Sequence, residues 1–372
     1  MDPAELPAAI TLLLLPKAGP ASIARLLEAG GSPRGALELP RPRLDSLGLR
    51  PETAIAVGAT QGRATDEAQR RCERLLTLGA QALLYSDAGY PPMLRQIQRP
   101  PPILFLQGRE AALHAPQIAV VGSRSPTPAG REFAAELAAG LVRYGLAITS
   151  GLARGIDTAA HWGTLGADGA ALAVMGTGSD RIYPAANRAL AERILGSGGV
   201  LITEYPPESH PDAAHFPQRN RIISGLSLGV VVVEAGLPSG SLSTATHAAE
   251  QGREVMAVPG PVRSPTSRGC HELLRNGAAL IETPEDVIRA LGDRFKPAAQ
   301  PPSPSAGSSA SPRVPLDPVA QRVLAATDTA PCSIDMLVSR SGLSAAEVSV
   351  AVVQLELSGW LETVPAGVAR VR

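Results

Sequence analysis

The sequence contains very few lysines and aromatic residues, and each shortage limits how the chain can bind a ligand. Its only lysines are Lys17 and Lys296, so nearly all positive charges are arginines. This bias either suits bidentate phosphate binding or reflects only the base composition of the genome. Aromatic residues make up 3% of the chain, so stacking surfaces must be few. The formal net charge is zero, which restricts any polyanion site to a local patch.

Cysteine and histidine are too scattered to indicate a metal or redox centre. Cys72, Cys270 and Cys332 form no CxxC pair, and the six histidines show no metal-ligand spacing. We therefore expect no metal and no cofactor, and a reducing compartment. The apolar run near the N-terminus is too short to span a membrane and has no basic stretch before it. We expect the protein to be cytoplasmic and not to insert into membranes.

Several motifs of nucleotide and acyl chemistry are missing. The sequence has no GxxxxGK[ST] loop, and no GxGxxG fingerprint follows the first predicted strand of the sheet. The stretch from Gly240 to Thr244 does not fit a Gly-x-Ser-x-Gly nucleophile elbow. These absences disfavour ATP hydrolysis, nicotinamide binding and serine hydrolysis, and we expect no enzymatic activity.

Residues 1–80 are predicted to form a small helical domain. Apolar stretches at 10–15 and 23–27 flank a turn that runs from Pro16 to Pro20. The pattern is similar to a SAM or helix-hairpin-helix element, whose turn offers backbone N–H groups to a phosphate. A plain helical hairpin with a Gly-Pro turn is the simpler explanation of the same pattern.

Residues 81–295 are predicted to form an α/β domain with an extended Rossmann-like, doubly wound sheet. Continuous apolar runs alternate with helical stretches such as 130–144 and 241–251, which indicates parallel strands covered on both faces. The predicted strands are 118–121, 146–149, 171–175, 200–203, 230–233 and 254–258.

The C-terminal part divides into a linker and a second small domain. Residues 296–318 are rich in Pro, Ser and Ala and are predicted to be a flexible linker. Residues 319–372 are predicted to form three helices and a hairpin, which suggests a winged helix. The third helix, 344–357, holds no Lys or Arg, and the domain has four arginines against five acidic residues. We expect this domain to dock protein or regulate a dimer, because strong duplex binding needs cations.

Small residues, arginines and polar side chains follow the predicted strands, where ligands bind in a doubly wound sheet. Helix N-termini and closely approaching backbone would hold anions there, so we expect a phosphate-binding crevice. Its candidate residues are Gly122, Ser123, Arg124, Ser150, Gly151, Arg154, Gly178, Arg181, Arg188, Ser239, Gly240 and Ser241.

The segment Arg219-Asn220-Arg221 precedes an apolar helix. Asn220 could cap that helix or bond a base edge or phosphate, with the two arginines gripping a backbone. The alternative is a helix cap with two surface arginines. Trp162, Tyr183 and Phe216 are candidate stacking platforms if they are not core residues.

An ordered set of motifs resembles the bacterial DNA-processing protein DprA (Smf) family. The stretches are Tyr90-Pro91-Pro92-Met93-Leu94, Pro101 to Phe105, Val120 to Arg124, Ser150 to Asp157, Gly176-Thr177-Gly178 with Tyr183-Pro184, Phe216 to Ile223, Val233-Glu234-Ala235, Ser239-Gly240-Ser241, Val258-Pro259-Gly260 and Gly269-Cys270.

The resemblance implies a protein that binds single-stranded DNA and helps load the RecA recombinase. It would protect incoming strands in natural transformation, support DNA recombination and form a homodimer through its Rossmann domain. Arg124 matches the DNA-contacting arginine of the family, and Arg219, Asn220 and Arg221 match its Arg-Asn-Arg element. One departure is Ala185, where many members carry a DNA-binding lysine; Arg181 or Arg188 could supply that contact.

Two other classes of function remain. One is a nucleotide-processing enzyme of the phosphoribohydrolase-like Rossmann group. The loop from Leu237 to Ser241 would correspond to its nucleotide-binding loop, and Glu250 would be a distant counterpart of its catalytic glutamate. The other is a pure interaction scaffold with a relic crevice.

Overall fold

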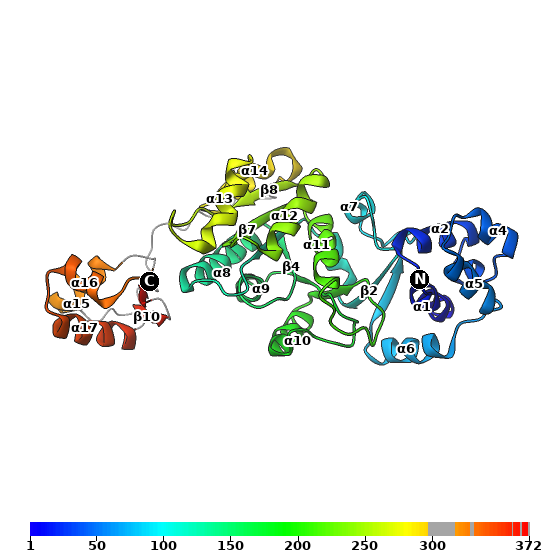
Figure 1. Cartoon of the computed structure of the whole chain (residues 1–372), viewed down its shortest axis with the longest axis horizontal. Coiled ribbons are helices and arrows are strands. Elements are labelled where there is room, and N and C mark those ends of the chain that lie inside the picture. The colour runs from blue at the N-terminus through cyan, green and yellow to red at the C-terminus, as the bar shows by residue number, and fades with distance from the viewer. Residues whose placement is uncertain (297–316, 328–330, 359, 365–366, 371–372) are drawn as a thin grey trace.

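The computed structural model describes residues 1–296, 317–327, 331–358, 360–364 and 367–370 (Figure 1). Most of the predicted linker 296–318 therefore lies outside the described residues. In the part that is described, no single helix is long and apolar enough to cross a membrane. By length and composition alone, the two helices at 334–341 and 345–357 would together suffice, but they meet at a bend of 109°.

The N-terminal residues form a helical unit. Prolines begin several of these helices, where the missing N–H costs no hydrogen bond, and Thr65 caps the last by accepting from the N–H of Ala68. Its helices are α1 (Leu6–Leu14), α2 (Pro20–Gly30), α3 (Pro33–Leu37), α4 (Arg41–Ser46), α5 (Pro51–Ala59) and α6 (Asp66–Thr77). Apolar side chains of α1 and α6, including Ile10 and Leu75, pack with Phe105 of the sheet, so one core continues across residue 80.

A nine-stranded sheet forms the centre of the molecule (Figure 1). Its order is β1-β2-β6-β5-β4-β3-β7-β8-β9; β2 runs antiparallel to both neighbours and all other pairs are parallel. The strands are β1 (Gln81–Leu84), β2 (Ile103–Gly108), β3 (Gln117–Gly122), β4 (Ala147–Ser150), β5 (Ala171–Val174), β6 (Val200–Thr203), β7 (Gly229–Val233), β8 (Glu254–Ala257) and β9 (Ala279–Leu280). The predicted α/β doubly wound fold is confirmed, with β1, β2 and β9 added to the six predicted strands.

Helices cover both faces of the sheet, which is why its central strands are apolar on both sides. The short helix α7 (Pro92–Arg95) and helices α11 (His215–Leu226), α12 (Gly240–Glu250) and α13 (Arg268–Arg275) pack on one face. The other face carries α8 (Pro128–Arg143), α9 (Ile156–Gly166), α10 (Arg188–Gly196) and α14 (Pro284–Leu291).

The C-terminal unit contains three helices and a two-stranded antiparallel hairpin, as a winged helix requires. The elements are α15 (Pro318–Ala326), α16 (Ile334–Ser341), α17 (Ala345–Leu357), β10 (Leu361–Val364) and β11 (Gly367–Arg370). Its separate core is built around Val323, Leu337, Val348 and Leu355.

Candidate nucleic-acid interface

The order of the strands places a crevice between β3 and β7. After β3 the chain turns to β4 on one side, and after β6 it returns over the sheet through α11 to β7 on the other side. Loops that leave β3 and β7 therefore diverge at their carboxyl ends, where doubly wound sheets bind ligands. A cavity of about 860 Å³ lies there. Among the predicted site residues, its lining includes Gly122, Ser123, Arg124, Arg219, Asn220, Ser239, Gly240 and Ser241.

The loop after β3 is held close to the backbone of the neighbouring strand. The N–H of Ser123 donates to the carbonyl of Glu234, 2.7 Å away, and the carbonyl of Ser123 accepts from the N–H of Ile156. A Cβ atom on Gly122 would lie 1.8 Å from the carbonyl oxygen of Val233. Only glycine fits there, so this loop presents backbone rather than a side chain at its first position.

Arg124 extends from that loop as an exposed cation. Its guanidinium lies 5.6 Å from the centroid of the Phe216 ring, and no carboxylate of the described residues is within ion-pair distance of it. A free guanidinium at the mouth of a cavity is available to a phosphate.

The opposite wall of the crevice is the N-terminus of α12. Ser239 is the N-cap, and its side chain accepts from the N–H of Ser241. A Cβ atom on Gly240 would meet nothing within 4 Å, so the first turn is open to solvent. Free N–H groups and the helix dipole make this end suitable for an anion.

Asn220 supports this helix end, and the prediction that it caps an apolar helix is wrong. Helix α11 begins at His215, so Asn220 lies in its second turn. The side-chain amide donates to the carbonyl of Gly240 at 3.1 Å and to the hydroxyl of Ser243 at 2.7 Å. Asn220 therefore fixes the position of α12 against α11.

Arg219 lies in the wall of the crevice and does not extend freely from it, which corrects the expected picture of a surface arginine. Its side chain is buried and donates to the carbonyls of Gly151, at 2.6 Å, and Val174. Burial, followed by the nearby Arg124 charge, lowers the pKa of Arg219 to about 10, with Asp157 acting against this change. Asp157 accepts from the N–H of Gly151, and burial raises its pKa despite Arg219. The two hydrogen bonds of Arg219 tie Val174, at the end of β5, to Gly151, which follows β4.

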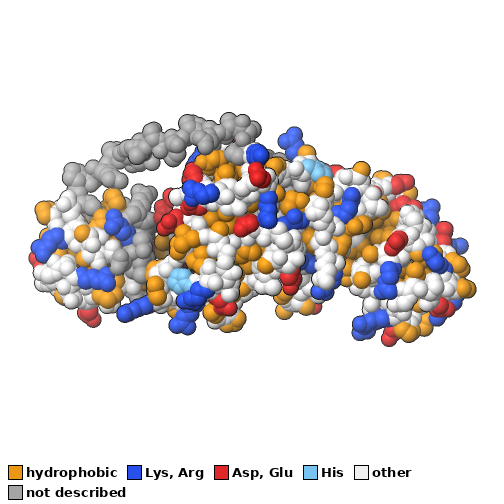
Figure 2. Space-filling view, turned by 90° about the horizontal axis from the view of Figure 1, so that it is seen from above, with side chains coloured by type: hydrophobic (Ala, Val, Ile, Leu, Met, Phe, Trp, Pro, Cys, Tyr) orange, Lys and Arg blue, Asp and Glu red, His pale blue; other side chains and the backbone are white. Residues whose placement is uncertain are grey.

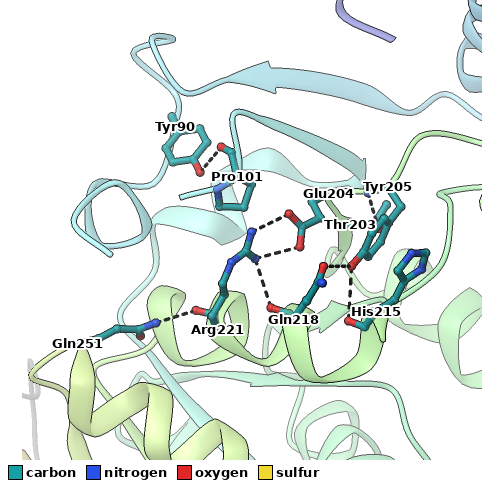
Figure 3. Close-up of polar contacts among 9 residues, drawn as sticks. All are labelled: Tyr90, Pro101, Thr203, Glu204, Tyr205, His215, Gln218, Arg221 and Gln251. Atoms are coloured by element: carbon teal, nitrogen blue, oxygen red, sulfur yellow. Dashed lines mark hydrogen bonds and ion pairs between the residues drawn. The ribbon is translucent and has the colours of Figure 1, made fainter. Parts of the chain in front are cut away.

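Arg221 points away from the crevice, so the expected cluster of two arginines does not form there. Its guanidinium makes a bidentate ion pair with Glu204, with N–O distances of 2.9 and 2.7 Å (Figure 3). Both side chains are at most 12% exposed. Gln251 donates to the carbonyl of Arg221, which ties α11 to the end of α12. Arg221 is a structural ion-pair partner in this arrangement.

Ser150, Gly151, Arg154 and Gly178 are predicted site residues that are absent from the cavity lining. Gly151 and Gly178 are buried, and the hydroxyl of Ser150, at the end of β4, donates to the carbonyl of Val120 in β3. Arg154 is exposed near the crevice and is absent from its lining.

Two smaller hollows share walls with the crevice. One, of about 400 Å³, adjoins it at Arg124 and continues to Arg131 and Trp162, whose ring side chain is 47% exposed. The other, of about 380 Å³, adjoins it at Tyr183. It contains Ala185 together with the predicted alternatives Arg181 and Arg188, and Arg74 from α6. The three hollows form one series, which we call the groove.

Sequence reasoning missed Arg268, Arg131 and Arg74. Arg268 begins α13 after β8 and lines the crevice; the rule applied to the earlier strands would have found it. Arg74 pairs with Asp180 at 3.2 Å, a contact between distant parts of the chain that no local pattern shows.

Figure 2 shows one face of the molecule, on which Lys and Arg side chains are scattered among hydrophobic and acidic ones. Glu250, the distant counterpart of a catalytic glutamate, lies outside the crevice lining and pairs with His247. In the described segments, no three His, Cys, Asp or Glu side chains are grouped to hold a metal ion.

The fold and the site define a Rossmann-type domain with an arginine-lined crevice at the carboxyl ends of its strands, followed by a winged helix. The chain belongs to the DNA recombination-mediator protein A family, whose model matches residues 81–292; a DprA winged helix domain model matches residues 297–367.

Relatives support this assignment along most of the chain. Protein Smf of Escherichia coli is 42% identical over 285 residues, which cover 76% of this chain and 75% of that protein. DNA processing protein DprA of Streptococcus pneumoniae is 45% identical over 202 residues, covering 54% and 71%.

Two solved structures share the architecture. The structure of DprA from Streptococcus pneumoniae has a TM-score of 0.61 at 35% identity and covers 74% of this chain and 98% of that chain. A structure of DNA processing protein A from Helicobacter pylori, described as showing a single-stranded DNA binding mode, has a TM-score of 0.53 at 28% identity, with coverage of 58% and 97%.

Proposed function

We propose that this protein binds single-stranded DNA along the groove, without catalysis. The observation that carries the proposal is the convergence of the unpaired Arg124 and the open N-terminus of α12 on one crevice. Both groups recognise phosphate without regard to base sequence. The Helicobacter pylori relative, described as binding single-stranded DNA, supports the same ligand here.

The groove gives the proposed strand a path. From the crevice the strand continues past Arg124 toward Arg131 and Trp162 on one side, and past Tyr183 toward Arg188 on the other. Trp162 and Tyr183 are each about half exposed, so each offers a face on which a base can stack. Arg181 and Arg188 supply the charge that Ala185 lacks. A single strand fits such a path because its bases are free to stack.

Fluorescence anisotropy with labelled oligo(dT) and with a duplex of equal length tests the proposal. We expect tighter binding to the single strand, with affinity that falls steeply as salt rises. Binding should quench the fluorescence of Trp162, and Trp162→Phe should remove most of that quenching, whereas Trp360→Phe should not. Equal affinity for both DNAs, or no binding at low salt, would refute the proposal.

The cellular role is part of the same proposal and is supported by the family. The protein would load a RecA recombinase onto single strands, protect incoming DNA in natural transformation and act as a homodimer through its Rossmann domain in the cytoplasm. Cys72 and Cys270 are buried free thiols, which fit a reducing compartment. Faster recombinase filament assembly on strands already covered by a single-strand binding protein would support the loading role. Release of free base from nucleoside monophosphates would instead indicate an enzyme.

A further inference from the structure

Helix α17 occupies the place of the third helix of a winged helix, the one that usually enters the DNA major groove. In this chain it carries no Lys or Arg, and it carries Glu347 and Glu356. A surface of this charge repels phosphates. Helix α17 lies at the edge of the C-terminal unit in Figure 1, and its charge makes it unsuited to grip a duplex.

One face of α17 is apolar and exposed. Val350, Val353 and Leu357 are 69%, 54% and 85% exposed, and Ala346 is exposed one turn earlier. The opposite face of the same helix is already buried in the domain core. The exposed positions follow a spacing of four, three and four residues, which is the a/d spacing of a helix that packs along a second helix. We call these four residues the seam.

The seam is complementary to itself when two copies run antiparallel. Val350 then faces Val353 of the second copy, and the small Ala346 faces the large Leu357, so each layer has a similar volume. A parallel pair would instead place Leu357 against Leu357 and Ala346 against Ala346, leaving a gap at one end.

The charges beside the seam also suit antiparallel pairing. Glu347 would lie opposite Gln354 of the second copy, and Ser349 opposite Glu356. Each carboxylate thus meets a neutral polar residue, so pairing places no like charges together.

We propose that the winged-helix domain self-associates through antiparallel pairing of the α17 seam with the same seam of a second copy. The seam spans only about three helical turns, so the area it buries is below the roughly 1,000 Å² of an independently stable interface. The contact is therefore weak by itself and is best detected by covalent trapping.

Disulfide trapping in the full chain tests this pairing. Val350→Cys and Val353→Cys are made separately, carry tags of different size, and are mixed under mild oxidation. Antiparallel pairing predicts that the mixed disulfide forms faster than either disulfide between identical chains. The native cysteines are buried, so the wild-type chain should give no crosslinked product. Glu362→Cys, exposed on β10 of the same domain, measures random collision.

Charge variants provide a second test, because a folding defect could not increase the yield of the mixed disulfide. Ser349→Lys, which would face Glu356 of the second copy, should raise the yield of the mixed disulfide about twofold, and Gln354→Glu, which would face Glu347, should lower it about as much. Equal trapping of all cysteine pairs at the rate of Glu362→Cys would overturn the proposal. So would seam-dependent binding to phosphatidylglycerol vesicles or to duplex DNA, abolished by Val353→Asp, in a protein that shows no trapping.

Discussion

Removing the guanidinium of Arg124 should weaken single-strand binding while leaving the fold intact. Arg124 is exposed and has no carboxylate partner among the described residues, and its guanidinium lies over the Phe216 ring at the crevice mouth. Its loss on Arg124→Ala therefore removes a ligand contact and little else. A charge-assisted contact contributes about 1.4 kcal/mol or more, which corresponds to at least a tenfold rise in Kd.

The dependence of DNA affinity on salt concentration gives a second, independent measure of the Arg124 contact. Each phosphate contact on a single strand contributes about 0.7 to the slope of log affinity against log salt. Arg124→Ala should reduce the slope by about that amount, and Arg124→Lys should keep the slope because it keeps the charge. Arg143→Ala is the matched control. Arg143 is an exposed arginine in the last turn of α8, near the amino end of β4, whereas the crevice lies at the carboxyl ends of the strands.

Anisotropy titrations of oligo(dT) at four or five salt concentrations would measure both quantities. Circular dichroism would show that each variant is folded. An unchanged Kd and slope for a folded Arg124→Ala protein would refute the assignment of this crevice to a phosphate backbone.

Three further predictions concern the frame around the crevice. Burial, and then the charge of Arg219, lower the pKa of His161 to about 3. Below about pH 6.5 the unfolded chain therefore binds a proton at this histidine that the folded chain does not, and the free energy of unfolding should fall by about 2 kcal/mol from pH 7 to pH 5. His161→Leu should flatten this part of the pH dependence in urea denaturation. Gly122→Ala should cost about 3 kcal/mol or more because its methyl group meets a β7 carbonyl, whereas Gly166→Ala, with open space, should be neutral or stabilise by up to about 1 kcal/mol in thermal melts. Glu204→Gln should destabilise by about 3 kcal/mol because it leaves Arg221 unpaired, and a double variant that also carries Arg221→Gln should recover part of the loss.

The position of the crevice could be predicted from the sequence because hydrophobic periodicity alone fixes which loops share a sheet edge. The ends of β3 and β7 are 111 residues apart in the sequence, from Gly122 to Val233, yet parallel pairing places them side by side. The sequence predicts only that the crevice lies at the carboxyl ends of the parallel strands, whereas the strand order places it between β3 and β7. Strand β9 was not predicted because it has only two residues, which are too few to show a hydrophobic pattern.

The Arg-Asn-Arg segment shows why the site could not be predicted in full. Once these residues lie inside a helix, successive side chains point about 100° apart. Arg219 then points to the ends of β4 and β5, Asn220 to α12, and Arg221 to Glu204. Local sequence does not reveal this because the residue before α11 is Ala214, which makes no side-chain cap hydrogen bond. The start of the helix is set by tertiary packing instead of by a local signal.

The pairing of β3 with β7 has a consequence for the order of events during synthesis. The ribosome releases the first wall of the crevice long before the second, and Arg268 follows later still. A growing chain that stops short of α13 lacks a complete ligand site, however well its first helices have formed. The crevice is therefore complete only after most of the sheet has been made.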